Sequence, residues 1–394
     1  MSAIKEPLLP VPGFSWLGEN VGIKDDQPDF AVAWSRVPCQ AAGVFTRNNF
    51  PGAPLVVGKE HLGDGQLQGV VVNSKNANVA TGSQGLENAR RICAMAGEAM
   101  GVPPELVLPS STGVIGVPLP MERIIGAFDG LGSRLKEDRA GLEAFSRAIM
   151  TTDTRPKAIS LRVGSATLTG VAKGAGMIEP NMATMLAYFF TDAELQAPVL
   201  QGMLGRVVKR SFNRISVDTD TSTSDTAVIL ANGIAGSVNE AEFETALLEA
   251  SVFLAKEIAR DGEGATKLIE LSVFGAPTDE VALQFGKTII NSPLVKTAIH
   301  GADPNWGRFV MAVGKVFEHP VPLEDLSITF GNGKPPLTIT ATVQSDQVLQ
   351  DIGAYLTGNE IKIRVGVGRG AGESIVWGCD LTEGYVKENA DYTT

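Results

Sequence analysis

A threonine between a flexible loop and a buried strand is the residue of this sequence best suited to nucleophilic chemistry. Residues 170–183 are rich in glycine, and residues 185–190 form an apolar, aromatic run typical of a strand. Thr184 stands at their junction. If the chain were cut before Thr184, one residue would carry both a hydroxyl and a new α-amino group. Such an amine titrates at about pH 8 and can accept the hydroxyl proton, so the residue would supply a nucleophile and its base. The alternative is that Thr184 only opens a β-strand, as threonine often does.

A second candidate for chemistry is the turn after a strand expected at 106–108. Residues 109–116 read Pro-Ser-Ser-Thr-Gly-Val-Ile-Gly. A hydroxyl side chain beside a glycine can direct an O–H and an unhindered backbone N–H at one point, which is what an oxyanion hole requires. An ordinary Ser/Gly turn is the competing interpretation.

Three further polar or glycine-rich segments invite comparison with binding loops. Residues 215–226 contain alternating aspartates but lack the central glycine and terminal glutamate of a calcium loop, so we expect a polar loop lining a ligand pocket. Glu263 lies on a tight loop, where it either faces a site or is an exposed turn acid. The glycines at 366, 368, 370 and 372 precede a strand-like run rather than a helix, which favours a β-turn over a phosphate-binding loop.

The composition predicts a globular protein that binds neither nucleic acid nor a metal ion. The 394 residues are 44% hydrophobic and 20% charged, and the net charge of −11 disfavours contact with phosphates. Three cysteines and three histidines form no metal-ligand pattern and no disulfide framework. We see no signal sequence and no apolar run long enough to span a membrane, so we expect a cytoplasmic protein.

Hydrophobic spacing predicts alternating strands and helices around these segments. Helices are expected at 86–100, ended by Gly101, and at 121–150, 198–212 and 243–258. Strands are expected at 31–34, 70–72, 106–108, 185–190, 227–230 and 269–273, with two more on either side of Gly164. This order places Thr184 at the start of one strand and the Ser/Gly turn at the end of another.

The threonine stretch resembles a specific motif. Residues 173–180, Lys-Gly-Ala-Gly-Met-Ile-Glu-Pro, followed by Met-Ala-Thr-Met-Leu at 182–186, resemble the self-cleavage and nucleophile motif of the ornithine acetyltransferase family. These are the arginine-pathway glutamate N-acetyltransferases. The resemblance extends in order along nearly the whole chain, through residues 73–82, 111–116, 150–157, 261–267, 295–308 and 377–394.

This resemblance implies a role for each candidate residue. Thr184 would be the nucleophile, exposed by self-cleavage of the Ala183–Thr184 bond into an α chain (1–183) and a β chain (184–394) that together form one α/β unit. Thr112 would supply a hydroxyl, and Gly113 a backbone N–H, to the oxyanion hole. The residues implied to line the amino-acid site are Thr151, Thr152, Lys173, Thr184, Glu263, Asn389 and Thr394. Because the last two lie in the C-terminal tail, we expect the tail to be ordered over the pocket rather than frayed.

The resemblance also implies a fold and an activity. The fold would be α/β, with stacked helix–sheet–sheet–helix layers similar to those of N-terminal-nucleophile hydrolases. The activity would be transfer of the acetyl group from N2-acetylornithine to glutamate through an acetyl-threonine, in a ping-pong mechanism. No cofactor or metal is implied, although acetyl-CoA could serve as a second donor and make the enzyme bifunctional. The α and β chains would assemble as α2β2 or larger.

Departures from the family pattern leave the pathway open. Arginine-pathway members commonly carry glycine where this chain has Lys75 and alanine where it has Val79, and a subgroup from secondary-metabolite gene clusters also departs here. A paralogue in such a pathway is therefore one alternative. Another is an amidase or aminopeptidase of related fold, in which water replaces glutamate. A binding protein that kept the fold would require Thr184 or the oxyanion turn to be missing, and both are present.

Overall fold

The described part of the chain packs into two units. The computed structural model describes residues 3–179, 185–331, 333, 337–340 and 345–391. The first unit comprises Met1–Asn213 and Asp220–Ile258, and the second comprises Arg214–Thr219 and Ala259–Thr394. These two packing units do not correspond to the expected α chain (1–183) and β chain (184–394). Those chains are defined by cleavage of one peptide bond, and that cleavage stays a prediction.

The first unit is built on a nine-stranded mixed sheet ordered β1-β6-β7-β8-β10-β3-β4-β5, with β2 paired to β3. Its strands are β1 (Ala3–Lys5), β2 (Phe14–Glu19), β3 (Phe30–Phe45), β4 (Gln66–Asn73), β5 (Val107–Ser111), β6 (Lys157–Val163), β7 (Ala166–Lys173), β8 (Leu186–Glu194) and β10 (Thr226–Ser237). Its helices are α1 (Ala53–His61), α2 (Gly82–Met100), α3 (Met121–Ile124), α4 (Leu131–Arg134), α5 (Arg139–Ala148), α6 (Ala197–Arg210) and α7 (Glu240–Arg260), whose last two residues belong to the second unit.

The long strand β3 folds this sheet into two facing layers. Its pairing with β4 shifts register between Trp34 and Cys39; residues before the shift also pair with β2, and residues after it pair with β10. Side chains from the two layers meet in one core. The Phe190 ring of β8 lies 5.3 Å from Phe14 and 6.0 Å from Trp16 of β2, measured between ring centroids.

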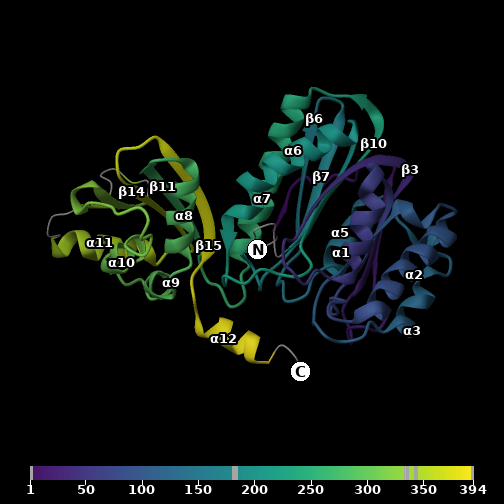
Figure 1. Cartoon of the computed structure of the whole chain (residues 1–394), viewed down its shortest axis with the longest axis horizontal. Coiled ribbons are helices and arrows are strands. Elements are labelled where there is room, and N and C mark those ends of the chain that lie inside the picture. Colours follow the sequence, from purple (N-terminus) through teal and green to yellow (C-terminus); the bar gives the residue numbers. More distant parts are fainter. Residues whose placement is uncertain (1–2, 180–184, 332, 334–336, 341–344, 392–394) are drawn as a thin grey trace. The chain divides into compact units, whose positions relative to one another are not determined.

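Helices cover the two outer faces of this double layer, as Figure 1 shows. On one side, apolar residues of α1 and α2 such as Val57 and Ile92 pack with the outward-facing Val32 of β3. On the other side, a Cβ added at Gly170 of β7 would lie 3.0 Å from Leu254 of α7. The expected helix–sheet–sheet–helix order is therefore present in the first unit.

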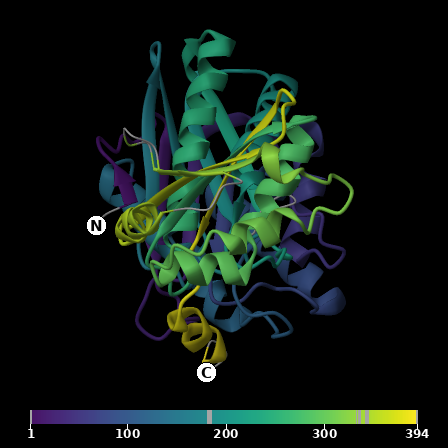
Figure 2. The same cartoon turned by 90° about the vertical axis from the view of Figure 1, so that its left-hand side faces the viewer.

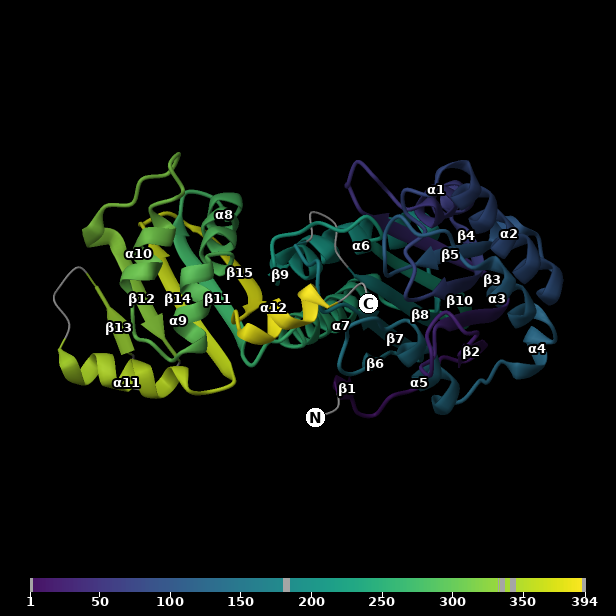
Figure 3. The ribbon, with the colours of Figure 1, turned by 90° about the horizontal axis from the view of Figure 1, so that it is seen from below.

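The second unit is a six-stranded sheet with helices packed on it, ordered β13-β12-β14-β11-β15-β9 (Figure 3). Its strands are β9 (Ile215–Ser216), β11 (Leu268–Ala276), β12 (Leu326–Phe330), β13 (Leu337–Ile339), β14 (Glu360–Val367) and β15 (Gly372–Cys379). Its helices are α8 (Asp279–Ile290), α9 (Pro293–His300), α10 (Gly307–Val313), α11 (Asp346–Leu356) and α12 (Glu383–Ala390), the yellow helix beside the label C in Figure 2. Ile269, Leu271 and Val273 of β11 alternate into the core against Phe285 of α8, as their spacing predicts.

Side-chain caps begin several of these helices by accepting a backbone N–H of the first turn. Asp138 accepts from Gly141 at α5, Thr278 from Val281 at α8, Ser292 from Val295 at α9, Ser345 from Val348 at α11, and Thr382 from Gly384 at α12. At the other end, α2 stops at Gly101, whose left-handed φ of 71° confirms the predicted helix end.

One helical prediction was wrong. Residues 121–150 do not form a continuous helix but break into α3, a short 3-10 turn, α4 and α5. Two local features interrupt them: Gly130 has a left-handed φ of 62°, and Lys136 pairs with Trp16 in an isolated β-bridge. The other expected strands and helices are present, and the glycine-rich segment after 366 connects β14 to β15, as expected for a β-turn. Among the described residues, no helix combines the length and apolarity needed to cross a membrane.

Candidate active site

The expected oxyanion turn lies at the end of β5, against the asparagine loop that follows β4. Thr112 is buried, and its backbone N–H donates to the Asn73 carbonyl at 3.1 Å. Gly113 has a φ of 135°, and a Cβ added there would lie 2.1 Å from the carbonyl carbon of Lys75. Only glycine fits this close approach, since both the φ and the space exclude a side chain. The turn is therefore a built structure rather than an ordinary surface turn.

Hydrogen bonds of two asparagine side chains support this turn. Ser111 donates to Asn73 Oδ1 at 2.6 Å, and Asn73 Nδ2 donates to the Asn76 carbonyl at 2.8 Å. Asn76 Nδ2 in turn reaches the carbonyls of Val117 and Pro118 at 3.1 Å. Because every member is hydrogen-bonded, this buried network holds the backbone of the turn in one conformation.

Lys173 connects the oxyanion turn to the threonine pair at 151 and 152. It is the last residue of β7 and is only 6% exposed. Its Nζ donates to Thr151 Oγ1 at 2.8 Å and to Thr112 Oγ1 at 3.4 Å. Thr152 is half-buried next to Thr151. The structure thus brings together five of the residues chosen from the sequence: Thr112, Gly113, Thr151, Thr152 and Lys173.

A buried carboxylate, Asp153, organises this cluster, although sequence analysis did not select it. Asp153 Oδ1 accepts from Lys157 Nζ at 2.7 Å and from the Gly174 N–H at 2.6 Å, and Oδ2 accepts from the Thr151 N–H at 3.1 Å. Burial by itself would raise the pKa of Asp153, but the charges of Lys157 and Lys173 and these hydrogen bonds hold it well below its usual range. Asp153 therefore carries a full negative charge beside the site.

Two further lysines near the cluster were not predicted as site residues. Lys24 Nζ donates to the Met150 carbonyl at 2.7 Å, next to Thr151 in the chain. Burial lowers the pKa of Lys24 to about 8; Asp29 and Asp153 oppose this shift, and the charges of Lys173 and Lys75 add to it. No local signal could reveal Lys24, because it lies 126 residues before Met150.

Lys75 was noted in the sequence only as a departure from the family pattern. It has a left-handed φ of 77°, which costs an L-residue roughly 1–2 kcal/mol. The glycine common in the family at this position would avoid that cost. Its carbonyl accepts from the Val114 N–H at 2.9 Å, so the strained residue directly supports the oxyanion turn.

In the second unit, two predicted substrate residues meet. Glu263 follows α7 in a tight loop and is 9% exposed; its Oε2 accepts from Asn389 Nδ2 of α12 at 2.8 Å. Thr382, which caps α12, donates its hydroxyl to the Gly264 carbonyl at 2.6 Å. The C-terminal segment up to Asp391 is thus folded as a helix tied to this loop. Glu263 is not the freely exposed turn acid of the alternative interpretation.

Three predicted residues, Ala183, Thr184 and Thr394, lie outside the described residues. Next to the first two, Met185 is buried and Leu186 begins β8, which pairs with β7 on one side and β10 on the other. The expected strand after Thr184 is therefore present at the centre of the sheet.

The polar loop at 215–226 does not form a metal site in the described structure. Its middle packs on neighbouring loops: Asn48 Nδ2 donates to the Thr221 carbonyl at 2.8 Å, and the Glu179 N–H donates to the Asp220 carbonyl at 2.9 Å. No group of three or more metal-ligand side chains is present in the described part of the chain.

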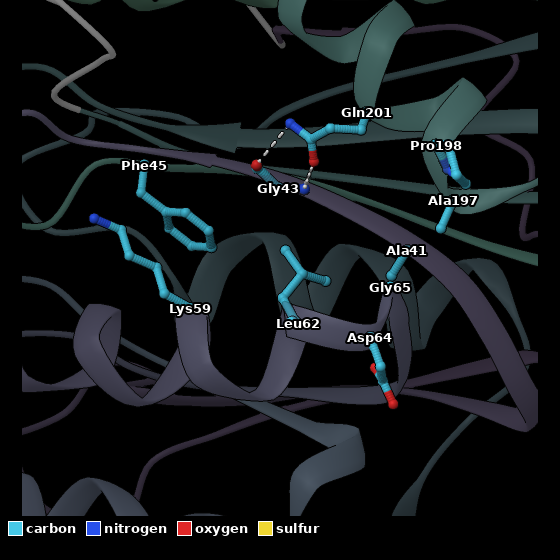
Figure 4. A pocket seen from close by; sticks show the side chains of 11 residues that line it. Ala41, Gly43, Phe45, Lys59, Leu62, Asp64, Gly65, Ala197, Pro198 and Gln201 are labelled. Carbon is cyan, nitrogen blue, oxygen red and sulfur yellow. Dashed lines mark hydrogen bonds between the residues drawn. The ribbon is translucent and has the colours of Figure 1, made fainter.

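A separate shallow pocket of about 410 Å³ lies between β3, α1 and α6 (Figure 4). Phe45 and Lys59 line one end of it, and the Gln201 amide bonds both the N–H and the carbonyl of Gly43 at 3.2 Å. None of the described residues chosen from the sequence lines this pocket.

We predict that Asp153→Asn lowers the free energy of unfolding by about 3–5 kcal/mol at pH 7, because it removes the negative partner of a fully buried lysine. The pKa of Asp153 is lowered in the folded state, so its stabilisation is present above the unfolded pKa of about 4 and is lost as pH falls below it. Urea unfolding of the wild type and of Asp153→Asn, at pH 7 and at lower pH, measures the difference in their free energies of unfolding. This difference should become smaller as the pH falls. The exposed Asp26→Asn is the control and should change stability by less than about 0.5 kcal/mol; an equal effect of the two variants would contradict the anchoring role.

Relief of the strain at Lys75 gives a second test. Lys75→Gly should raise the free energy of unfolding by about 1 kcal/mol, since glycine adopts a left-handed φ without penalty. Lys75→Ala also removes the charged side chain beyond the Cβ, but its Cβ keeps the strain of the left-handed φ. The free energy of unfolding of this variant should therefore not rise. Thermal unfolding compares the stability of the wild type and the two variants. If Lys75→Gly is no more stable than Lys75→Ala, the left-handed φ at position 75 does not strain the folded protein.

Comparison with known proteins places this chain in a family. The family model described as "ArgJ family" matches residues 15–394. The "Arginine biosynthesis bifunctional protein ArgJ 2" of Clostridium acetobutylicum is 48% identical over 382 residues, 97% of each chain. The "Glutamate N-acetyltransferase Oat2" of Streptomyces clavuligerus is 48% identical over 377 residues, 95% of each chain. A second "Arginine biosynthesis bifunctional protein ArgJ 2", from a Nostoc species, is 46% identical over 383 residues, again 97% of each chain. The chain belongs to the ArgJ family, which confirms the resemblance seen in its motifs.

Proposed function

We propose that this protein is a glutamate N-acetyltransferase that moves the acetyl group from N2-acetylornithine to glutamate after cutting its own chain before Thr184. The membership of the whole chain in the ArgJ family supports the activity, and the names of its relatives point to acyl transfer in arginine biosynthesis. The observation that carries the assignment in the structure is the contact between Lys173 Nζ and Thr112 Oγ1 beside the glycine-only turn at Gly113.

In the first half-reaction, the Thr184 hydroxyl attacks the acetyl carbonyl carbon and its proton passes to the α-amino group. Negative charge then develops on the carbonyl oxygen, where Thr112 and Gly113 are placed to donate hydrogen bonds. The Lys173 ammonium donates to Thr112 Oγ1, so it uses a lone pair of that oxygen and leaves the hydroxyl hydrogen available for the oxyanion. The C–N bond breaks, the nitrogen takes the proton, and ornithine leaves the acetyl-threonine.

In the second half-reaction, the glutamate amine attacks the acetyl-threonine and restores the hydroxyl, which completes a ping-pong cycle. Thr151, whose N–H donates to Asp153, and Lys173, which donates to the Thr151 hydroxyl, supply polar groups beside the acyl carbonyl. Glu263, held by Asn389, supplies a carboxylate suited to a substrate ammonium. Thr152 and Thr394 complete the set that we assign to the amino-acid substrates.

The proposal extends to assembly and donors. The β8 strand lies between β7 and β10, so a cut before Thr184 would leave the α and β chains sharing one sheet. The two chains then remain together and assemble as α2β2 or larger, in the cytoplasm. The acetyl group is carried by threonine and needs no cofactor, and acetyl-CoA is a second donor to be assayed directly.

Two alternatives differ in a measurable way. An amidase would release ornithine from N-acetylornithine at the same rate with and without glutamate, whereas the transferase requires the acceptor. A paralogue in a secondary-metabolite pathway is the other alternative, and complementation of an arginine auxotroph tests it: growth on minimal medium supports a role in arginine biosynthesis.

Processing is the first functional prediction. Denaturing mass spectrometry of the purified protein should show two polypeptides that meet at the Ala183–Thr184 bond. Thr184→Ala removes the hydroxyl that attacks the bond, so this variant should remain one chain and be inactive. Thr184→Ser keeps a hydroxyl and should still be cut. An active enzyme that remains one intact chain would eliminate the α-amine as the base.

The oxyanion role predicts a loss of rate rather than of binding. Thr112→Ala should lower kcat for acetyl transfer by on the order of 10²–10³, with little change in substrate affinity. Thr112→Ser, which retains the hydroxyl, should stay much closer to the wild-type rate. Steady-state kinetics with both substrates measures the difference. If Thr112→Ala keeps the wild-type kcat, Thr112 does not stabilise the oxyanion.

A further inference from the structure

Asp380, a buried carboxylate directly after β15, makes four polar contacts within the described part of the chain. Its Oδ1 accepts from the backbone N–H of Thr266 at 2.8 Å and from that of Lys267 at 2.9 Å. Its Oδ2 accepts from the Thr266 hydroxyl at 2.5 Å and lies 2.9 Å from His300 Nδ1. A carboxylate offers about four acceptor sites, so the Asp380 side chain, which is 0% exposed, uses its full capacity on these neighbours.

Two of the neighbours of Asp380 belong to a loop that carries a proposed substrate residue. Loop 261–267 joins α7 to β11, and it presents Glu263. Its last two residues are the ones whose N–H groups donate to Asp380. Closer to Glu263, the Gly264 carbonyl accepts from the hydroxyl of Thr382, two residues beyond Asp380. The segment that follows β15 therefore holds this loop at two points, one next to Glu263 and the other three residues after it.

The end of loop 261–267 is anchored a second time by the Lys267 side chain. Its Nζ donates to the carbonyls of Ile299 at 2.6 Å, His300 at 3.0 Å and Leu356 at 2.6 Å. These carbonyls lie at the C-terminal ends of α9 and α11, where helices leave carbonyls without an intrahelical partner and attract a cation. Burial lowers the pKa of Lys267, and the charge of Asp380 opposes this shift. The end of the loop therefore cannot move without breaking buried polar contacts.

We propose that Asp380 is a positioning residue for acetyl transfer: it fixes loop 261–267 so that the Glu263 carboxylate meets the free ammonium of N2-acetylornithine. This inference rests on the proposed function, which assigns Glu263 to the amino-acid site. The bond from Asn389 to Glu263 Oε2 orients the carboxylate, and Asp380 sets where the backbone of the loop places it. Asp380 thus acts through the loop rather than on the reacting atoms.

The chemistry of the two substrates makes this role measurable. N2-acetylornithine keeps a side-chain ammonium, whereas the single amine of glutamate is the nucleophile and must be uncharged when it attacks. A carboxylate at position 263 therefore stabilises the bound donor and offers no matching contact to the acceptor. Charge-assisted hydrogen bonds weaken steeply when their distance or angle departs from the ideal. A displaced loop should consequently weaken binding of N2-acetylornithine selectively.

Steady-state kinetics of the purified wild type and four variants, with N2-acetylornithine and glutamate varied in turn, tests the proposal. Asp380→Asn keeps the shape of the side chain, but its amide turns a donor toward at least one of the groups that donate to Asp380. Thr266→Val removes only the hydroxyl that donates to Asp380, and Thr266→Ser retains it. Asp351→Asn changes an exposed acid on α11 of the same unit and is the matched control.

Asp380→Asn should raise the KM for N2-acetylornithine by about 10–100-fold, the loss expected when a hydrogen bond to a charged group fails. Its kcat and its KM for glutamate should change by less than about threefold, because the acyl chemistry is untouched. Thr266→Val should raise the KM for N2-acetylornithine by at least about threefold. Thr266→Ser and Asp351→Asn should match the wild type.

A purely structural role of Asp380 would give a different result, since partial unfolding lowers the turnover of both substrates alike. A wild-type KM for N2-acetylornithine in folded Asp380→Asn would overturn the positioning role while leaving the transferase intact. If Asp380→Asn does not fold, a wild-type KM for N2-acetylornithine in Thr266→Val would overturn it in the same way. A wild type that releases no ornithine in response to glutamate would instead overturn the proposed function, and the inference with it.

Discussion

The site depends first on one buried carboxylate. Asp153 binds Lys157 at the start of β6, the backbone of Gly174 after β7 and the backbone of Thr151, so a single charge fixes three segments. This arrangement is stable because the charge is both paired and fully hydrogen-bonded, which offsets the cost of burial. Thr151 and Lys173 take their positions from it, and Lys173 in turn contacts Thr112. The geometry of the expected acyl site thus follows from Asp153 more than from the residues that would touch the substrate.

The oxyanion turn shows how backbone strain is distributed at a functional site. The backbone of Lys75 approaches Gly113 so closely that a side chain would not fit at 113, and both residues have a positive φ. Glycine meets this requirement at 113 without cost, whereas Lys75 meets it with strain. The Lys75 side chain also adds a positive charge near Lys24, which contributes to the lowered pKa of Lys24. Strain of this kind persists only where surrounding structure enforces it, here the braced asparagine loop.

The contrast between Asp153 and Asp225 shows two environments of a buried acid. Asp153 is charged and paired, and the charges of Lys157 and Lys173 together with the Gly174 N–H hold its pKa down against the effect of burial. Asp225 is only 1% exposed, and burial raises its pKa well above its usual range. The same residue type therefore has a lowered pKa where two lysines surround it and a raised pKa where burial dominates. The charge of Lys173 acts on the pKa of both acids, so they share one electrostatic neighbourhood.

Local pattern and motif determined much of this protein. The sequence alone predicted the strand after Thr184, the helix that ends at Gly101 and the family itself, because each depends on neighbouring residues. The layered order of the fold came from the family resemblance rather than from spacing. Continuity of a helix over 121–150 was predicted wrongly, since a left-handed glycine and a bridge to a distant strand outweigh helical spacing.

Tertiary structure alone decided which charges meet. Lys24 and Met150 are 126 residues apart, and Asp225 lies level with Met185 only because β8 and β10 pair in parallel. Neither neighbourhood leaves a signal in local spacing, because burial and long-range pairing set the pKa of each group. The residues expected to react could be named from the sequence, whereas the buried charges that anchor them could be identified only once the chain was folded.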